Sequence, residues 1–197
     1  HCQCRRQRQM CIRDSNGVLP DDLVVKHVQQ VPSDFHARHS SVGKRYRYLV
    51  CNLPYRSPFS RNKSWWVRKS LNLEAIREAS SYLVGKHDFS AFRAAACSSP
   101  NPNKDLREIL CDVKPWLHAN LCFELEADSF LQHMVRIMVG TLVQVGTGKL
   151  KPEQMKGILE SRDRTQAGLT APAHGLYALA VRYPEDRIEW PDELMDS

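Results

Sequence analysis

The sequence predicts an α+β domain in which an antiparallel or mixed sheet carries its helices on one face. Two observations lead to this fold class. Segments with strand patterns occur in the same chain as segments with helical periodicity. Between two of the strand segments, His118, Ala119 and Asn120 suit a hairpin turn, which makes the flanking strands antiparallel. The 197 residues, 42% apolar and 25% charged, are enough to bury the core of one globular domain.

The first predicted elements are two strands. Leu23–Val31 is rich in valine, and Lys44–Cys51 alternates basic with apolar side chains, so both segments are typical of strands. In the second strand, Tyr46 and Tyr48 face one side of the sheet, and the arginines beside them face the other. Such tyrosines are either core residues or, in a cleft, rings that stack on a base or transfer a proton.

Helices are predicted from the spacing of apolar residues. Asn72 can cap a first helix that ends at Gly85, and Asp128 or Ser129 can cap a long, very apolar helix that runs to about Val145. Pro152 stands where a third, short helix begins. The remaining strands are expected at 107–116, 121–127 and 176–183.

Positive charge is concentrated in the first part of the chain. Residues 1–70 hold 14 Lys or Arg and 4 Asp or Glu, a net charge of +10, which leaves −4 for the rest of a chain whose total is +6. Aromatic residues alternate with these cations through residues 45–69. The mixture suits RNA, because cations neutralise phosphates and flat rings stack on exposed bases. A solvated basic face over core aromatics is the alternative interpretation.

Residues 1–15 have no periodic pattern, so we predict an unstructured or foreign leader there. A zinc site of His1, Cys2, Cys4 and Cys11 is a weaker interpretation, since the spacing fits no standard zinc motif. The odd cysteine count argues against a disulfide framework. With no signal peptide or membrane span in the pattern, we expect a cytoplasmic protein, or an organellar one, with no membrane partner. An acidic tail is expected at 185–197.

A narrow polar stripe crosses the long apolar helix. Gln132, Arg136, Gly140 and Gln144 recur every four residues, with His133 beside them. A buried arginine needs an anion, because an unpaired buried charge is strongly destabilising. Arg136 therefore either forms a structural salt bridge or holds a catalytic carboxylate or an RNA phosphate in a cleft. No spacing typical of metal ligands or of a nucleotide-phosphate loop occurs elsewhere in the chain.

Five motifs, in order, resemble the TruA-type tRNA pseudouridine synthases. They are DFHAR (34–38), KRYRYLV (44–50), DFSAFRAAAC (88–97), DSFLQHMVRIMVGTLVQVG (128–146) and GLYALAVRYP (175–184). The likeness covers residues 16–184, which we expect to form a pseudouridine-synthase-like catalytic domain. The resemblance implies an isomerase that converts uridine to pseudouridine in the anticodon arm of tRNA, with tRNA as its partner, no cofactor or metal, and a homodimer as the full-length form.

The resemblance also implies roles for individual residues. Tyr46 would lie against the flipped uracil and assist removal of the carbon-5 proton, Arg136 would pair with the nucleophilic aspartate, and Leu176 would form part of the apolar wall. Contacts to the RNA are expected from Arg38, Lys44, Arg45, Arg93 and His133.

One part of the family pattern is missing. In the family the nucleophile stands in an Arg-Thr-Asp-x-Gly-Val-His-Ala segment upstream of the FHAR motif, and these 197 residues contain no Arg-Thr-Asp triplet. We therefore expect an incomplete catalytic domain that is inactive by itself. The alternative hypothesis is a non-catalytic RNA-binding remnant of the same fold.

Overall fold

The structure, a computed structural model, describes residues 2–116 and 119–184, without the side chains of residues 2–6 and 114–116. The chain divides into two compact units, one formed by residues 1–40 with 183–197 and the other by Ser41–Arg182. The compact second unit thus begins later than the predicted domain boundary at residue 16. The predicted acidic tail lies outside the described residues.

The first unit corrects two predictions. Residues 1–15, predicted to be unstructured, lie almost entirely within α1 (Cys2–Val18). Its arginine, glutamine and methionine residues favour helix intrinsically, without an apolar stripe. Leu23–Val31, predicted as a strand, has no strand conformation. Its valines suit a strand, but a strand also needs a partner. Here Val25 instead exchanges hydrogen bonds with the Asn16 side chain, at 2.7 and 3.0 Å.

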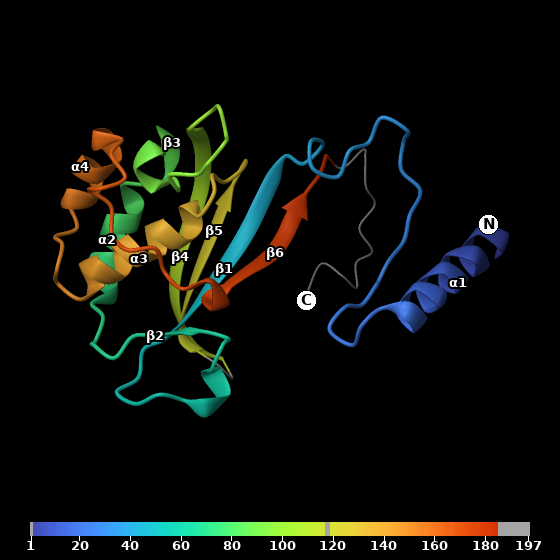
Figure 1. Cartoon of the computed structure of the whole chain (residues 1–197), viewed down its shortest axis with the longest axis horizontal. Coiled ribbons are helices and arrows are strands. Elements are labelled where there is room, and N and C mark those ends of the chain that lie inside the picture. Colours follow the sequence, from blue (N-terminus) through green and yellow to red (C-terminus); the bar gives the residue numbers. More distant parts are fainter. Residues whose placement is uncertain (1, 117–118, 185–197) are drawn as a thin grey trace. The chain divides into compact units, whose positions relative to one another are not determined.

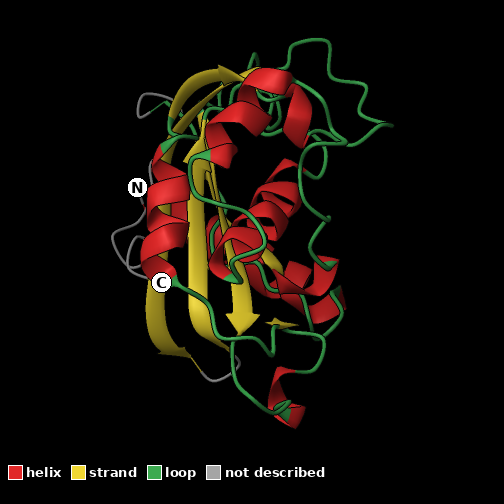
Figure 2. Ribbon diagram, turned by 90° about the vertical axis from the view of Figure 1, so that its left-hand side faces the viewer, coloured by secondary structure: helices red, strands yellow, loops and turns green. Residues whose placement is uncertain are grey.

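The second unit contains a six-stranded mixed sheet, which confirms the predicted fold class. Its strands are β1 (Gly43–Cys51), β2 (Trp65–Trp66), β3 (Gly85–Asp88), β4 (Asn103–Trp116), β5 (Ala119–Ala127) and β6 (Leu176–Arg182). The order is β2-β1-β5-β4-β3, with β6 also paired to β1. The β1–β2 pair is parallel and the other pairs are antiparallel. Figure 2 shows the long strands side by side and twisted.

The helices of this unit gather on one side of the sheet (Figure 1). They are α2 (Leu73–Ser81), α3 (Met134–Gly146) and α4 (Gln154–Ser161), with short 3-10 turns η1 (Pro58–Ser60), η2 (Ser90–Phe92) and η3 (Ala173–Gly175). Asn72 caps α2 as predicted, since its side chain accepts a hydrogen bond from Ala75 N at 3.1 Å. No helix in the described ranges is long and apolar enough to cross a membrane.

α3 begins at Met134, four or five residues later than predicted. Ser129 to His133 form a loop instead, and His133 ends it in the left-handed conformation, with φ 61°. A single residue in this conformation breaks the helical hydrogen bonding. It does so here even though most of the nearby residues, before and after it, are apolar. Most of α3 is buried between the sheet and its neighbours, as its apolar circumference predicted.

Gly140 lets a loop pack directly on α3. A Cβ atom at this position would collide with the backbone carbonyl of Leu169, whereas Gly157 in α4 has no atom near its missing Cβ. Gly140, the small residue of the predicted stripe, is therefore where the backbone of α3 meets the backbone of the loop at Leu169. Close approach of this kind requires glycine.

We predict that Gly140→Ala lowers the free energy of unfolding by about 3 kcal/mol, because the loop has to move off the helix. Chemical denaturation measures this change. The matched control is Gly157→Ala, which should raise stability by roughly 0.5 to 1 kcal/mol, since a helix interior favours alanine over glycine. Equal effects of the two substitutions would contradict the close approach at Gly140.

Candidate active site

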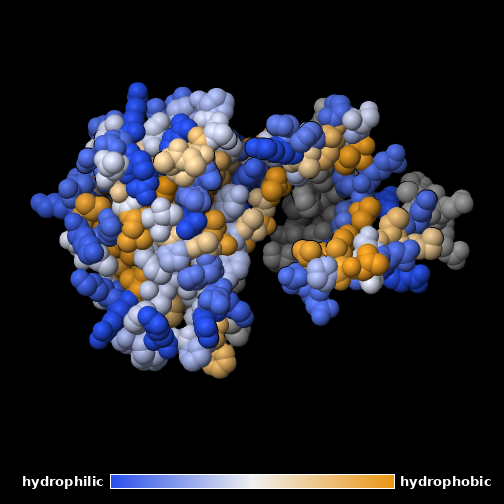
Figure 3. Space-filling model, in the orientation of Figure 1, coloured by the Kyte–Doolittle hydropathy of each residue, from blue (hydrophilic) through white to orange (hydrophobic). Residues whose placement is uncertain are grey.

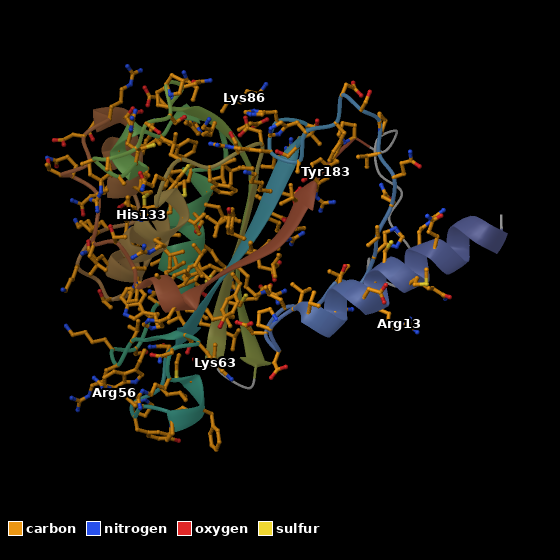
Figure 4. The ribbon with its side chains drawn as sticks, turned by 45° about the vertical axis from the view of Figure 1, so that its right-hand side comes forward. Arg13, Arg56, Lys63, Lys86, His133 and Tyr183 are labelled. Carbon is orange, nitrogen blue, oxygen red and sulfur yellow. The ribbon has the colours of Figure 1, made fainter. Side chains whose placement is uncertain are left out.

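Four of the predicted site residues line one cavity of about 350 Å³. Tyr46 comes from β1, His133 from the end of the loop before α3, Arg136 from the first turn of α3, and Leu176 from the start of β6. These positions are as much as 130 residues apart in the sequence. Figure 4 shows His133 beside α3, on the helix-covered side of the sheet. The cavity joins apolar residues to three residues with nitrogen-bearing side chains, Gln132, His133 and Arg136.

A contact between two aromatic rings holds Tyr46 in the lining of the cavity. Its half-buried ring meets Phe130 edge to face, with centroids 5.1 Å apart and planes at 89°. Tyr48, two residues further along β1, points to the same side and is fully buried. Its hydroxyl donates to the Pro172 carbonyl at 2.6 Å. The predicted alternation of β1 is therefore confirmed, with one tyrosine at the cavity and one in the core.

Arg136 is fixed by the backbone of the segment that precedes β6. Its Nε donates to the carbonyl of Ala171 at 2.7 Å, and the Ala171 N–H donates back to the Arg136 carbonyl at 3.0 Å. Within the described part of the chain, Arg136 forms no ion pair with a carboxylate. The carbonyl satisfies one donor of the guanidinium but leaves its positive charge without an opposite charge. A half-buried cation in such a cavity favours an anionic partner.

No acidic side chain lines this cavity among the described residues.

The charge of Arg136 also affects the pKa of Tyr48, the buried tyrosine of β1. Burial raises the pKa of the Tyr48 phenol well above its ordinary value, and the positive charge of Arg136 offsets part of this effect. Tyr48 is therefore a neutral structural hydroxyl. Of the two tyrosines, Tyr46 is the one that a substrate can reach.

The other predicted RNA contacts are dispersed. Arg93 is half-buried and donates to the Cys97 carbonyl at 2.6 Å, while the next residue, Ala94, donates to the backbone of Gln132 at 3.0 Å. Arg93 is therefore next to a residue that bonds to the cavity-lining loop, but it does not line the cavity itself. Lys44 stands two residues before Tyr46 in β1 and does not line the cavity. Arg38 is an exposed residue of the other compact unit.

Arg45 lies on the opposite face of the sheet from Tyr46. It donates two hydrogen bonds to Glu124 Oε2, at 2.8 and 3.1 Å, and Arg47 donates two to Oε1 of the same carboxylate. Arg45 also approaches Glu126 and Glu108, at 3.5 and 3.6 Å. In this structure, Arg45 is part of an ion-pair network on the sheet and is not grouped with the cavity residues.

Comparison with known proteins supplies the family. The model of the tRNA pseudouridine synthase family matches residues 79–184. Proteins named tRNA pseudouridine synthase A from Thermoanaerobacter sp. (strain X514) and Acetivibrio thermocellus are each 43% identical over 168 residues, which are 85% of this chain and 68% of theirs. The chain belongs to the tRNA pseudouridine synthase family. A third member, from Syntrophotalea carbinolica, is 43% identical over 176 residues, 88% of this chain and 68% of its own.

Some residues that line this cavity were not expected from the sequence. Phe130 was expected on the buried face of a helix, and the loop conformation places it at the cavity instead. Ala173 lies in η3 and carries no chemical signal that a sequence reveals. The left-handed residue at His133 is the feature that turns the loop, and nothing in the apolar pattern marks it.

The structure offers no candidate metal centre among the side chains it describes. The zinc interpretation of the leader rests on His1, Cys2 and Cys4, whose side chains lie outside that description. The cysteines with described side chains form no disulfide, and most of them are buried.

The Glu124 network predicts a pH-dependent contribution to stability. Burial alone would raise the pKa of Glu124, but hydrogen bonds and positive charge from Arg47 and then Arg45 outweigh it, so the pKa is below its ordinary value. A lowered folded pKa means that the carboxylate stabilises the fold fully above its unfolded pKa of about 4.3. That contribution is lost as the pH falls through the lower folded pKa.

We therefore expect Glu124→Gln to lower the free energy of unfolding at neutral pH by roughly 2 kcal/mol. The difference from the parent should shrink in acid, which urea unfolding at a series of pH values measures. Glu160→Gln is the control, because its pair with Lys156 is exposed and 3.9 Å long, so the midpoint should barely move. A Glu124→Gln deficit that stays constant into strong acid would contradict this account.

Proposed function

We propose that this chain carries the uracil-binding part of a tRNA pseudouridine synthase that acts on uridines of the anticodon arm. The observation that carries the proposal is the convergence of Tyr46, Arg136 and Leu176 on one cavity, since the family resemblance implies these three roles. The names of the relatives support the same reaction. Reaching such a cavity requires the target nucleotide to leave the base stack.

The reaction is an isomerisation, so atoms balance within the nucleotide. The bond from the ribose carbon 1′ to uracil N1 breaks, a bond from carbon 1′ to uracil C5 forms, C5 loses its proton and N1 gains one. Tyr46 stands where a flipped uracil would enter, and its phenol is proposed to assist the loss of the C5 proton. Phe130 fixes the orientation of the Tyr46 ring, and Leu176 provides an apolar wall beside which the uracil turns to present C5 to carbon 1′.

Arg136 is proposed to hold the nucleophilic carboxylate. The bond to Ala171 fixes the guanidinium at the cavity, and a carboxylate placed there would supply the missing opposite charge. The family motif for that aspartate, Arg-Thr-Asp, does not occur in these 197 residues. We propose that the carboxylate is supplied by a segment with this motif.

A second candidate function is supported by the absence of an acidic side chain from the lining of the described cavity. A non-catalytic module that binds RNA would need the basic residues but no nucleophile. Arg38, Lys44, Arg93 and His133 would contact RNA under either hypothesis, and phosphate contacts of this kind position the RNA without reading its sequence. Dimerisation of the full-length protein and a cytoplasmic location are further parts of the proposal.

The experiment is tritium release from tRNA labelled at uracil C5. We predict that residues 1–197 alone release no tritium, and that joining them to the Arg-Thr-Asp portion of a relative restores release. In the joined protein, Arg136→Ala should reduce turnover by about 100-fold with a much smaller effect on tRNA affinity, because the carboxylate loses its position. Tyr46→Phe should reduce turnover by roughly 100-fold or more if the hydroxyl assists proton transfer.

Tyr82→Phe is the matched control, since Tyr82 follows α2 and lies outside the cavity. It should leave turnover unchanged. Release by residues 1–197 alone, at the rate of the joined protein, would place the nucleophile within this chain, and Asp34 and Asp128 would be the first carboxylates to replace. Binding without release in the joined protein would favour the non-catalytic module.

A further inference from the structure

The loop between β1 and β2 has a basic and aromatic surface that the proposed reaction does not use. Residues 52–64, which connect the two strands, hold three Lys or Arg and no Asp or Glu. Figure 3 shows strongly hydrophilic side chains at the lower end of this unit, where Figure 1 places the loop. Arg56 and Lys63 project from it in Figure 4. Among the described residues, neither Arg56 nor Arg61 forms an ion pair, so their charges are available to a ligand.

Two aromatic rings on this loop are exposed to solvent. Tyr55 is 69% exposed and Phe59 is 77% exposed. Beside them, the Arg56 guanidinium lies over the ring of Trp66, 4.6 Å from its centroid. Exposed rings next to cations form the combination that binds single-stranded nucleic acid, because every base can stack on a ring and every phosphate attracts a cation.

The loop also encloses a cavity of about 430 Å³, lined by Arg56, Arg61, Trp65, Trp66 and His174 among others. Its walls are held in place by hydrogen bonds. The Asn52 side chain donates to the carbonyls of Val67 and Lys69, at 2.8 and 2.7 Å. The Trp66 indole donates to Leu53 O at 3.0 Å. A cavity with such supports exists before a ligand arrives, which lowers the entropy cost of binding.

This cavity is close to the candidate active site. Ala173 lines the cavity of Tyr46 and Arg136, while the next residue, His174, lines the cavity of the loop. Both residues belong to the short turn η3. One strand of RNA can therefore reach both cavities by crossing a single turn.

We propose that this loop binds an unpaired nucleotide adjacent in the RNA strand to the nucleotide that enters the candidate active site. Arg56 and Arg61, which line the loop cavity, bind its phosphate there. Its base stacks on Tyr55 or Phe59, which are exposed on the loop outside the cavity lining. The site holds the strand on the far side of η3, so that the flipped nucleotide enters the first cavity from a fixed direction. This inference rests on the proposed function, since it names a further contact of the same RNA.

The test measures binding of residues 1–197 to a short fluorescein-labelled oligouridylate by anisotropy over a series of salt concentrations. The aromatic variant is Tyr55→Ala/Phe59→Ala, and the charge variant is Arg56→Ala/Arg61→Ala. The control is Lys149→Ala/Lys151→Ala, which removes the same charge from exposed positions before α4. Thermal unfolding verifies that each variant folds like the parent.

We expect the aromatic variant to weaken binding about tenfold with an unchanged salt slope, because stacking does not depend on counterions. The charge variant should lower the salt slope by about 0.7, the value for the one phosphate of a single strand that Arg56 and Arg61 bind. The control should leave both quantities near those of the parent. If the control pair loses as much affinity as the loop variants, or if polyglutamate competes as well as RNA, the surface is a general anion site and the proposal is overturned.

The outcome is separable from that of the proposed function. Normal tritium release by the joined protein, together with parent-like binding by the loop variants, would remove this inference and leave the proposed reaction intact. Absence of tritium release together with the expected loss of oligouridylate binding would do the reverse.

Discussion

The reciprocal pair of hydrogen bonds between Arg136 and Ala171 is the contact on which the candidate site depends. It ties α3 to a segment that has no regular structure of its own. One residue later, the buried hydroxyl of Tyr48 holds the Pro172 carbonyl from the sheet side. The chain thus enters β6 from a point fixed by both layers. That constraint pairs Leu176 with Tyr48 across the β1–β6 register and brings Leu176 into the same cavity as Tyr46. One cavity is thus made from three distant segments.

Strand β1 separates two kinds of chemistry by the alternation of its side chains. On the helix side, its tyrosines form core and cavity. On the other side, Arg45 and Arg47 share the carboxylate of Glu124. Because the two oxygens of one glutamate each accept a pair of hydrogen bonds, the network is well satisfied despite its low exposure. The same strand therefore contributes both a stabilising network and the wall of a binding cavity.

The sequence could predict features that depend on local periodicity. The alternation of β1, the Asn72 cap and the apolar circumference of α3 follow from side-chain chemistry at fixed spacing. It could not predict the left-handed turn at His133, because a single backbone conformation leaves no periodic signal. The prediction of a strand in the valine-rich segment at 23–31 was wrong for a related reason. A strand forms only beside a partner strand, and composition does not reveal that partner.

The sequence by itself determined the fold class, the family resemblance and the residues to which that resemblance assigns roles. Only the tertiary structure decided which of them lie together. Arg45 and Tyr46 are neighbours in the chain but face opposite sides of the sheet, while Tyr46 and Leu176 are 130 positions apart and share a cavity. The physical reason is that a site is defined by long-range packing of α3, β1 and β6, and such packing depends on contacts that local patterns do not encode.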